Sequence, residues 1–259
     1  MQEAEQRKVY FASDMHFGSL YHQDPMAVER KFVRWLTMIQ ADAQALVLVG
    51  DVFDYWYEYK YVVPRGYTRV IGKLAELSDS GIEIILFTGN HDIWIFDYLP
   101  QEIGCKVYKE PQMLELLGAT FFIAHGDEFV PNDRGYHLLQ RLFRSRLCQF
   151  FYASIHPRWT VGFAHRWALH SRKKGIRKGH DEYRGEGNEY LVAYAKEYIA
   201  HHEGEPPRFF VFGHRHIELH LALWPKSEVL ILGDWVHHFS YAVWDGEQML
   251  LCNFELEEH

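Results

Sequence analysis

The sequence predicts an α/β fold in which a layered sheet is flanked by helices and interrupted by a basic helical insertion. Two observations predict it. In the first half of the 259-residue chain, short apolar runs alternate with amphipathic segments. After the helical segment, four or five strand-like runs close the chain between residues 208 and 254. The core is therefore expected to form from two separated parts of the sequence.

Strand-like and helix-like segments alternate from residue 9 to residue 92. We expect strands at residues 9–12, 45–49 and 82–87, because these runs are apolar and bounded by polar or glycine-containing segments. Asp24 and Pro25 suit the N-cap and the first turn of a helix that reaches about Ala41. A second helix is expected from about 67 to 78. This βαβαβ order predicts a sheet covered by helices.

The second half has a different organisation. Residues 113–117 and 120–124 predict a hairpin, and residues 135–179 have a helical pattern rich in Phe, Trp and Leu. A polar, glycine-rich break precedes another helix that ends near His202. We expect a core of residues 1–133 and 186–259, with residues 134–185 as a basic helical insertion.

The insertion concentrates positive charge in a chain whose formal net charge is -8. Between residues 134 and 180 there are eleven Lys or Arg residues and no Asp or Glu. Such a block indicates an anionic partner: a phosphate-bearing substrate, an acidic membrane surface or nucleic acid. A solvated helical face is the plain alternative. The Phe, Leu and Trp content favours lipid, and we expect no nucleic-acid partner because the rest of the chain is acidic.

The sequence also bears on location. The residues before Lys8 are polar, so we expect no export signal. No apolar run approaches the roughly 18 residues of a membrane-spanning helix. The three cysteines are scattered and odd in number, which favours a reduced cytoplasmic protein. Peripheral contact with the inner face of the inner membrane stays open, and the sequence does not predict an oligomeric state.

Five short polar blocks follow strand-like runs. Open α/β sheets usually carry their sites on loops at the carboxyl ends of strands, so these blocks are candidates for one site. Each block alone is weak, whereas all five together at strand ends are a specific signal. They are Asp14-Met15-His16, Gly50-Asp51-Val52-Phe53-Asp54, Gly89-Asn90-His91-Asp92, His125-Gly126-Asp127 and Gly213-His214-Arg215-His216.

The residue types in these blocks predict a two-metal centre. Carboxylates, imidazoles and one amide suit Mn²⁺, Fe²⁺ or Zn²⁺, and the lack of thiolates argues against structural zinc. Two such ions about 3.5–4 Å apart can share a carboxylate and activate water. We expect one metal at Asp14, His16 and His216, the other at Asn90, His125 and His214, and Asp51 as the bridge.

This constellation resembles the calcineurin-like metallophosphoesterase superfamily over the whole core. The resemblance implies a four-layer α/β/β/α sandwich. It also implies that His91 stabilises or protonates the leaving oxygen, with Asp92 orienting its ring. Asp54 is expected either to support a metal ligand or to cap a helix.

Four strings narrow the resemblance: "VGDVFDYW", "LSDSGIEIILFTGNHD", "HGDEFVPNDRGYHLL" and "LGDWVHHFS". They look like the UDP-2,3-diacylglucosamine diphosphatase family of lipid A biosynthesis, which has a helical lid after the His-Gly-Asp block. This resemblance implies hydrolysis of UDP-2,3-diacylglucosamine to UMP and 2,3-diacylglucosamine 1-phosphate, commonly with Mn²⁺. It also implies substrate contacts from Asp133, Tyr136, Ser171 and Lys178.

Two further possibilities stay open. Many members of that family have Arg where this chain has His91, and Gly-Asn-His-Asp is the broader superfamily form. A related hydrolase acting on another nucleotide diphosphate or a phosphodiester is therefore the alternative function. The tyrosines between Tyr55 and Tyr61 are expected either to line the substrate pocket or to pack beneath the lid.

Overall fold

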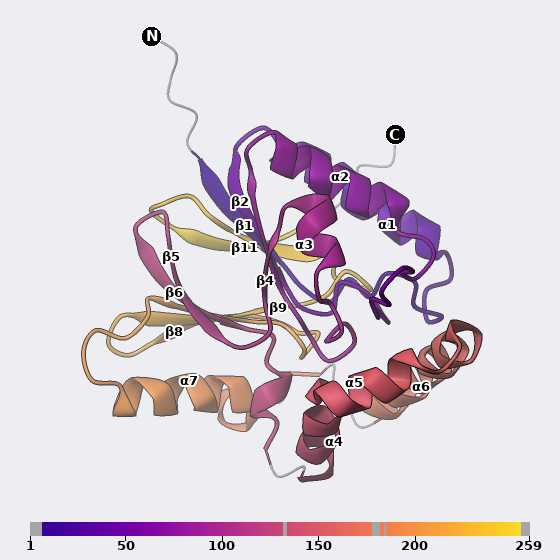
Figure 1. The fold of residues 1–259 in the computed structure, drawn as a ribbon. Helices are drawn as coiled ribbons and strands as arrows, with labels where there is room; N and C mark the ends of the chain where they lie inside the picture. The colour runs from indigo at the N-terminus through magenta and orange to yellow at the C-terminus, as the bar shows by residue number, and fades with distance from the viewer. Residues whose placement is uncertain (1–6, 132–133, 178–181, 184, 255–259) are drawn as a thin grey trace.

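The computed structural model describes residues 7–131, 134–177, 182–183 and 185–254. Two β-sheets lie face to face at its centre (Figure 1). The first sheet, in the order β11-β10-β1-β2-β3-β4, contains β1 (Lys8–Ala12), β2 (Ala43–Val49), β3 (Glu83–Phe87), β4 (Lys106–Tyr108), β10 (Ser240–Trp244) and β11 (Met249–Asn253). The second, in the order β5-β6-β7-β9-β8, contains β5 (Gln112–Leu116), β6 (Ala119–Ala124), β7 (Phe209–Phe212), β8 (Glu218–Leu223) and β9 (Ser227–Leu232).

Each sheet has a parallel centre. In the first sheet, β1, β2, β3 and β4 pair in parallel, and β10 and β11 pair antiparallel at one side. In the second, β6, β7 and β9 are parallel, with β5 and β8 antiparallel at the edges. Parallel neighbours end at the same edge of a sheet, so the loops after β1, β2 and β3 lie together, as do those after β6, β7 and β9.

Helices cover the outer faces of both sheets. A first apolar cluster joins α1, α2 and α3 to the first sheet, a second fills the space between the sheets, and a third joins the second sheet to α7. This arrangement confirms the predicted α/β/β/α layers. The covering helices are α1 (Pro25–Ile39), α2 (Thr68–Asp79), α3 (Tyr98–Ile103) and α7 (Tyr190–His201).

Burial explains why the strands are continuously apolar. The last five residues of β2, Ala45–Val49, are all buried, because parallel strands covered on both faces have no solvent side. Between the sheets, Phe121 of β6 stacks on Phe11 of β1 with ring centroids 5.3 Å apart, and its neighbour Phe209 in the second sheet stacks on it at 5.0 Å. Packing of this kind between the sheets holds them in a fixed relation, so loops from both can form one site.

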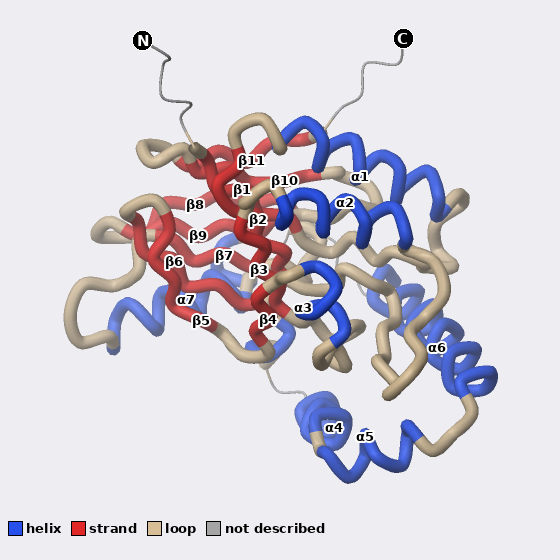
Figure 2. The backbone as a smooth tube through the Cα atoms, turned by 45° about the horizontal axis from the view of Figure 1, so that its top comes forward, coloured by secondary structure: helices blue, strands red, loops and turns tan. Residues whose placement is uncertain are grey.

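The insertion forms three helices that project beyond the sandwich (Figure 2). They are α4 (Arg134–Arg144), α5 (Arg146–Ala153) and α6 (Pro157–Arg177). Core side chains hold them through hydrogen bonds to main-chain carbonyls: Tyr57 Oη donates to Gln149 O at 2.8 Å, and Trp94 Nε1 donates to Phe143 O at 2.9 Å.

Among the described residues, no helix is both long enough and apolar enough to cross a membrane.

Two short elements, α3 and β4, were not predicted from the sequence. An α-helix of six residues and a strand of three give too little periodic signal. The start of α3 is stabilised by the buried Glu58 carboxylate, whose Oε2 accepts the main-chain N–H groups of Phe96 and Asp97 at 2.6 and 2.7 Å. This long-range cap replaces the local capping residue that a sequence pattern would reveal.

Candidate active site

All seven predicted ligands lie at the ends of strands, at one end of the sandwich. Asp14, Asp51 and Asn90 follow β1, β2 and β3 of the first sheet, whereas His125 and His214 follow β6 and β7 of the second. His16 and His216 lie two residues further along their loops. The site therefore spans both sheets, and no single part of the chain contains it.

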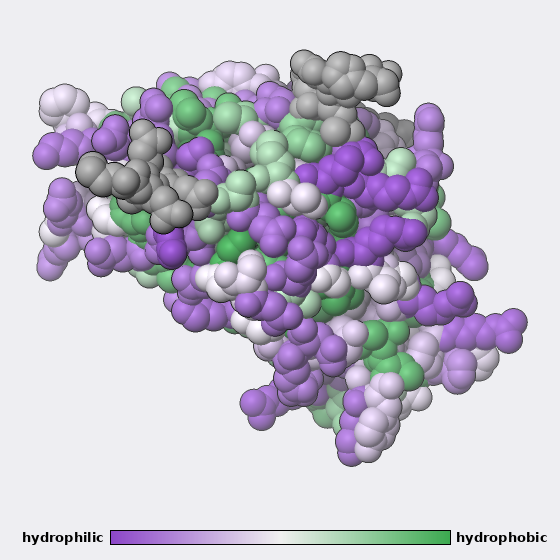
Figure 3. All heavy atoms as spheres, turned by 90° about the horizontal axis from the view of Figure 1, so that it is seen from above, coloured by the Kyte–Doolittle hydropathy of each residue, from purple (hydrophilic) through white to green (hydrophobic). Residues whose placement is uncertain are grey.

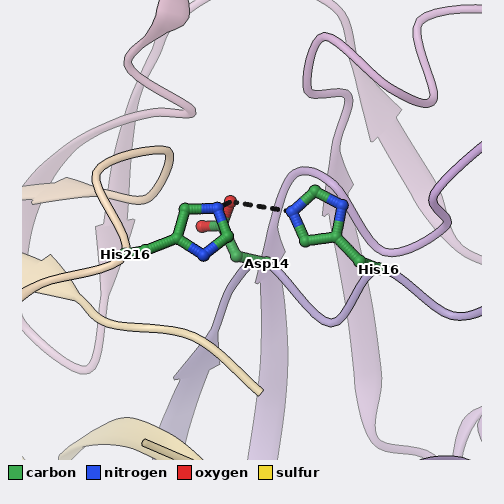
Figure 4. A group of neighbouring side chains, drawn as sticks. All are labelled: Asp14, His16 and His216. Carbon is green, nitrogen blue, oxygen red and sulfur yellow. Dashed lines mark ion pairs between the residues drawn. The ribbon is translucent and has the colours of Figure 1, made fainter. Parts of the chain in front are cut away.

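Asp14, His16 and His216 form the first group of potential ligands (Figure 4). Asp14 Oδ1 lies 3.6 Å from Nε2 of His16 and 3.3 Å from Nε2 of His216. The two rings are nearly parallel, with centroids 5.2 Å apart, and the carboxylate faces both of them. Three donor atoms from two distant segments of the chain thus converge on one point.

Asp51, His125 and His214 form the second group. Asp51 Oδ2 lies 3.4 Å from Nε2 of His125 and 3.7 Å from Nε2 of His16, so this oxygen faces both groups. Asn90 lies on the neighbouring loop, and its Oδ1 is buried without a hydrogen-bond partner in the described part of the chain. Asp51 is thereby placed between the two groups.

These distances fit metal ligands. Separations of 3.3–3.7 Å are longer than a good N–H···O hydrogen bond. Two ligands about 2.1 Å from one tetrahedral cation lie about 3.4 Å apart. A buried amide oxygen without a donor, such as Asn90 Oδ1, is a further ligand for a hard cation. The donor set therefore fits two divalent metal ions.

The pKa values of the site follow from burial and close charges. Burial and the neighbouring His125 ring together lower the pKa of His214 to about 4. Burial opposes ionisation of Asp51, but His125 and His91 outweigh it and hold the pKa of Asp51 well below its usual value. Burial also disfavours charged His125, yet Asp51 raises its pKa well above normal. A proton and a metal ion thus compete for that ring.

The loops hold unusual backbone conformations. Asp14, His16, Asp51, His214 and His216 all have positive φ values, between 46° and 64°. Non-glycine residues adopt this left-handed region rarely and at some energetic cost. Main-chain bonds between the loops offset that cost: Asp14 N–H donates to Gly50 O at 3.1 Å, and His16 N–H donates to Asp51 O at 2.9 Å. Five of the seven proposed ligands share this conformation.

A second layer of acceptors orients the imidazoles. His125 Nδ1 lies 2.8 Å from Val49 O, and His216 Nδ1 lies 2.9 Å from Asp234 Oδ2. Each bond leaves Nε2 directed at the centre of the site. No role was predicted for Asp234 from the sequence. A signal for it exists, because Gly233-Asp234 follows β9 as Gly50-Asp51 follows β2.

The expected role of Asp92 was wrong. Its carboxylate accepts main-chain N–H groups from Gly89 at 2.7 Å and Val52 at 2.8 Å, so it ties the loops after β2 and β3 together. The carboxylate is fully buried beneath these loops and is engaged there. The His91 ring is instead oriented by the main-chain carbonyl of Asp54, 2.9 Å from Nδ1.

The expected substrate contacts are only partly described. Tyr136 lies on α4, and its hydroxyl donates to Asp127 Oδ2 at 3.2 Å. Asp133 and Lys178 lie outside the described residues. Ser171 lies within α6, but its side chain is outside the described part.

A cavity of about 640 Å³ adjoins the ligand groups. Asp54, Asn90 and His91 contribute to its wall, and helices α4, α5 and α6 supply most of the rest. Tyr55 lines it, whereas Tyr57 packs beneath α5, so the two expectations for the tyrosine segment each hold for one residue. The apolar part of the wall includes Ile93, Trp94, Leu139, Phe143, Ile155, Trp159, Phe163, Ala164, Trp167 and Ala168.

The fold and the two ligand groups define a metallophosphoesterase, and comparisons agree. A family model of calcineurin-like phosphoesterases matches residues 7–218. The UDP-2,3-diacylglucosamine hydrolase of Porphyromonas gingivalis is 47% identical, covering 96% of this chain and 98% of that protein. The protein of the same name from Ectopseudomonas mendocina is 28% identical over the same shares. Among solved structures, the Escherichia coli phosphoesterase Yfce aligns with a TM-score of 0.43 and 17% identity, covering 91% of this chain and 87% of that one.

The chain therefore belongs to the calcineurin-like phosphoesterase family and, within it, to the family of the UDP-2,3-diacylglucosamine hydrolases. Membership implies a hydrolase that uses divalent metal ions. The cluster of potential ligands described above is where this chain offers donors for them.

The close approach of Gly89 to Asp51 gives a direct test. A Cβ at residue 89 would lie 2.2 Å from Asp51 Oδ1, so Gly89→Ala must displace that carboxylate. We expect metal affinity to fall by about 10- to 100-fold, measured by elemental analysis after dialysis at limiting metal. Gly72→Ala, at a helical position with open space around it, should keep wild-type metal content. A Gly89→Ala protein with unchanged metal content would contradict the placement of Asp51.

Proposed function

We propose that this enzyme hydrolyses the pyrophosphate bond of UDP-2,3-diacylglucosamine, giving UMP and 2,3-diacylglucosamine 1-phosphate. One observation carries the proposal: the apolar cavity beneath the insertion is lined by the proposed ligand Asn90 and by His91, whose main-chain N–H donates to Asp51. A substrate with a diphosphate and two acyl chains needs both environments within one site. The names of the curated relatives support the same substrate.

The proposed reaction is attack of water on the α-phosphorus of the UDP group. The bond from that phosphorus to the bridging oxygen breaks, and 2,3-diacylglucosamine 1-phosphate leaves. Bound at the two ligand groups, divalent ions, which we propose to be Mn²⁺, supply activation of water and neutralisation of phosphate charge. Asp14, His16 and His216 would hold one ion and Asn90, His125 and His214 the other, with Asp51 shared.

His91 is the proposed catalytic residue for the leaving group. Its main-chain N–H donates to Asp51 Oδ1 at 2.8 Å, which fixes the loop, and its Nδ1 lies 2.9 Å from Asp54 O. Nε2 is then the ring atom left for the leaving oxygen, where a proton stabilises the developing negative charge. Asp92 serves this step indirectly, because it holds the loop that carries His91.

We propose that residues 134–185 act as a lid over the acyl chains and that their outer face rests on the cytoplasmic side of an anionic membrane. Large apolar side chains of α4 and α5 are exposed, including Leu138 at 69%, Leu147 at 68% and Phe150 at 66%. Exposed Arg141 and Arg146 lie beside them. Mixed apolar and basic surfaces such as the exposed face of α4 and α5 bind anionic lipid. Figure 3 views the molecule from above, from the side of α1 and α2, where hydrophilic residues cover much of the surface.

Product analysis tests the substrate assignment. Purified protein with Mn²⁺ and UDP-2,3-diacylglucosamine should release UMP, detected by chromatography, and chelation of the metal should stop the release. The same preparation should hydrolyse a small activated phosphodiester, bis(p-nitrophenyl) phosphate. Hydrolysis of the small diester without UMP release would refute the substrate and favour another nucleotide diphosphate or phosphodiester.

Filling the cavity tests its role in acyl binding. Ala164 lines the cavity on α6, so Ala164→Trp should exclude part of an acyl chain. Loss of even two buried methylenes lowers kcat/KM for the diacylated substrate by about tenfold. Activity on bis(p-nitrophenyl) phosphate should not change. Ala153→Trp on the exposed face of α5 is the matched control and should affect neither substrate. Equal losses on both substrates for Ala164→Trp would mean that the cavity does not hold the acyl chains.

A further inference from the structure

Asp54 is a buried carboxylate that three imidazole rings approach from separate parts of the fold. Its side chain is 3% exposed. Oδ1 lies 3.5 Å from Nδ1 of His16 and 3.9 Å from Nδ1 of His91, whereas Oδ2 lies 3.8 Å from Nδ1 of His165. His16 follows β1, His91 follows β3 and His165 is on α6 of the insertion. Asp54 therefore connects a proposed metal ligand, the proposed catalytic histidine and the insertion.

The position of His165 is set by contacts on both sides of it. One turn earlier on α6, Thr160 Oγ1 lies 2.8 Å from the hydroxyl of Tyr59 in the core. The His165 ring meets Tyr55 edge to face, with centroids 5.8 Å apart, and the Tyr55 hydroxyl lies 2.9 Å from that of Tyr152 on α5. These contacts keep α6 from rotating, so its histidine stays directed at the core.

His165 has a buried ring atom aimed at Asp54. Its Nδ1 is buried and forms no hydrogen bond within the described residues, and Asp54 Oδ2 is the carboxylate oxygen that it faces. An N···O separation of 3.8 Å becomes a hydrogen bond when it shortens by less than about 1 Å. Hydrogen bonds at active sites commonly tighten in the same way when substrate binds.

We propose, on the basis of the hydrolytic function above, that His165 is a positioning residue that acts through Asp54 on His16 and His91. By holding Oδ2, it fixes the carboxylate whose Oδ1 faces His16 Nδ1, and this leaves His16 Nε2 for the metal. Asp54 also orients His91, because its main-chain carbonyl lies 2.9 Å from His91 Nδ1. The insertion then completes the metal centre as well as covering the acyl chains.

The size of the effect follows from the place of Asp54 in this chain of contacts. Groups that orient a metal ligand from behind change metal affinity or activity by about 10- to 100-fold when removed. His165 is one contact further from the metal than Asp54, so we expect its removal to lower metal affinity or activity by about tenfold, the low end of this range. His16 and His91 respond together, because both rings are oriented by the same residue.

The test compares His165→Ala, His165→Asn and His170→Ala. We expect His165→Ala to weaken Mn²⁺ binding about tenfold, measured as free Mn²⁺ by electron paramagnetic resonance. It should also lower kcat for bis(p-nitrophenyl) phosphate with little change in KM. In His165→Asn the amide N–H takes the place of Nδ1–H and should restore most of both. His170→Ala, at an exposed position of the same helix, should match wild type.

A double-mutant cycle separates this role from a general effect on the insertion. In an Asp54→Asn background, His165→Ala should cause no further loss of Mn²⁺ affinity or kcat, because both changes act through one contact. Additive losses, or unchanged values in His165→Ala alone, would overturn the proposal. If the Ala variant does not fold, as judged by circular dichroism, His165→Phe, which keeps a ring at this position but has no N–H to face Asp54, gives the same comparison in the two backgrounds. If the proposed function itself is wrong, the wild-type protein will bind no Mn²⁺ or release no UMP from UDP-2,3-diacylglucosamine.

Discussion

The Asp51 carboxylate faces His125 of one sheet at 3.4 Å and His16 of the other at 3.7 Å. It is 2% exposed, and a buried carboxylate surrounded by donors is stable only when positive charge or hydrogen bonds compensate its desolvation. Its Oδ1 accepts the His91 main-chain N–H, and its neighbour Gly89 has no room for a side chain. The rest of the site is arranged around this one carboxylate, because ligands from both sheets reach it only when the two sheets are packed in one fixed relative position.

Much of this arrangement follows from the sequence, because parallel strands bring their carboxyl ends together. The ligands Asp14, Asp51 and Asn90 each come directly after an apolar run, so their convergence needs only the strand order. The layered fold was predictable from the alternation of apolar strand-like runs with amphipathic segments. The division of the ligands between two metals stays a prediction: Asp14 lies near His16 and His216, whereas Asp51 lies near both His125 and His16.

Other features depend on contacts that no local pattern records. The left-handed backbone at Asp14 or His214 is held by bonds between distant loops, and sequence patterns assign that conformation to glycine. The role of Asp92 was misjudged because its neighbour His91 turns away from it, towards Asp54. No local pattern distinguishes His165 from the other histidines of the insertion. Its relation to Asp54 exists only because the insertion folds back over a loop more than a hundred residues earlier in the chain.

The insertion and the metal centre are one structural unit. The tyrosines after Asp54 hold α5 and α6 against the core, and His91 is part of the wall of the cavity between them. A lipid-linked diphosphate placed there would have its acyl chains under the helices and its phosphates at the ligand groups. In the proposed function, the strand ends provide the reaction chemistry and the insertion provides the selection of substrate.

The most direct measurement is anomalous diffraction at the manganese edge from crystals grown with Mn²⁺. Two peaks about 3.5–4 Å apart are predicted, one on either side of Asp51. Asp14, His16 and His216 should contact one peak, and Asn90, His125 and His214 the other. A single peak, or peaks that do not share Asp51, would contradict a two-metal centre built on this carboxylate.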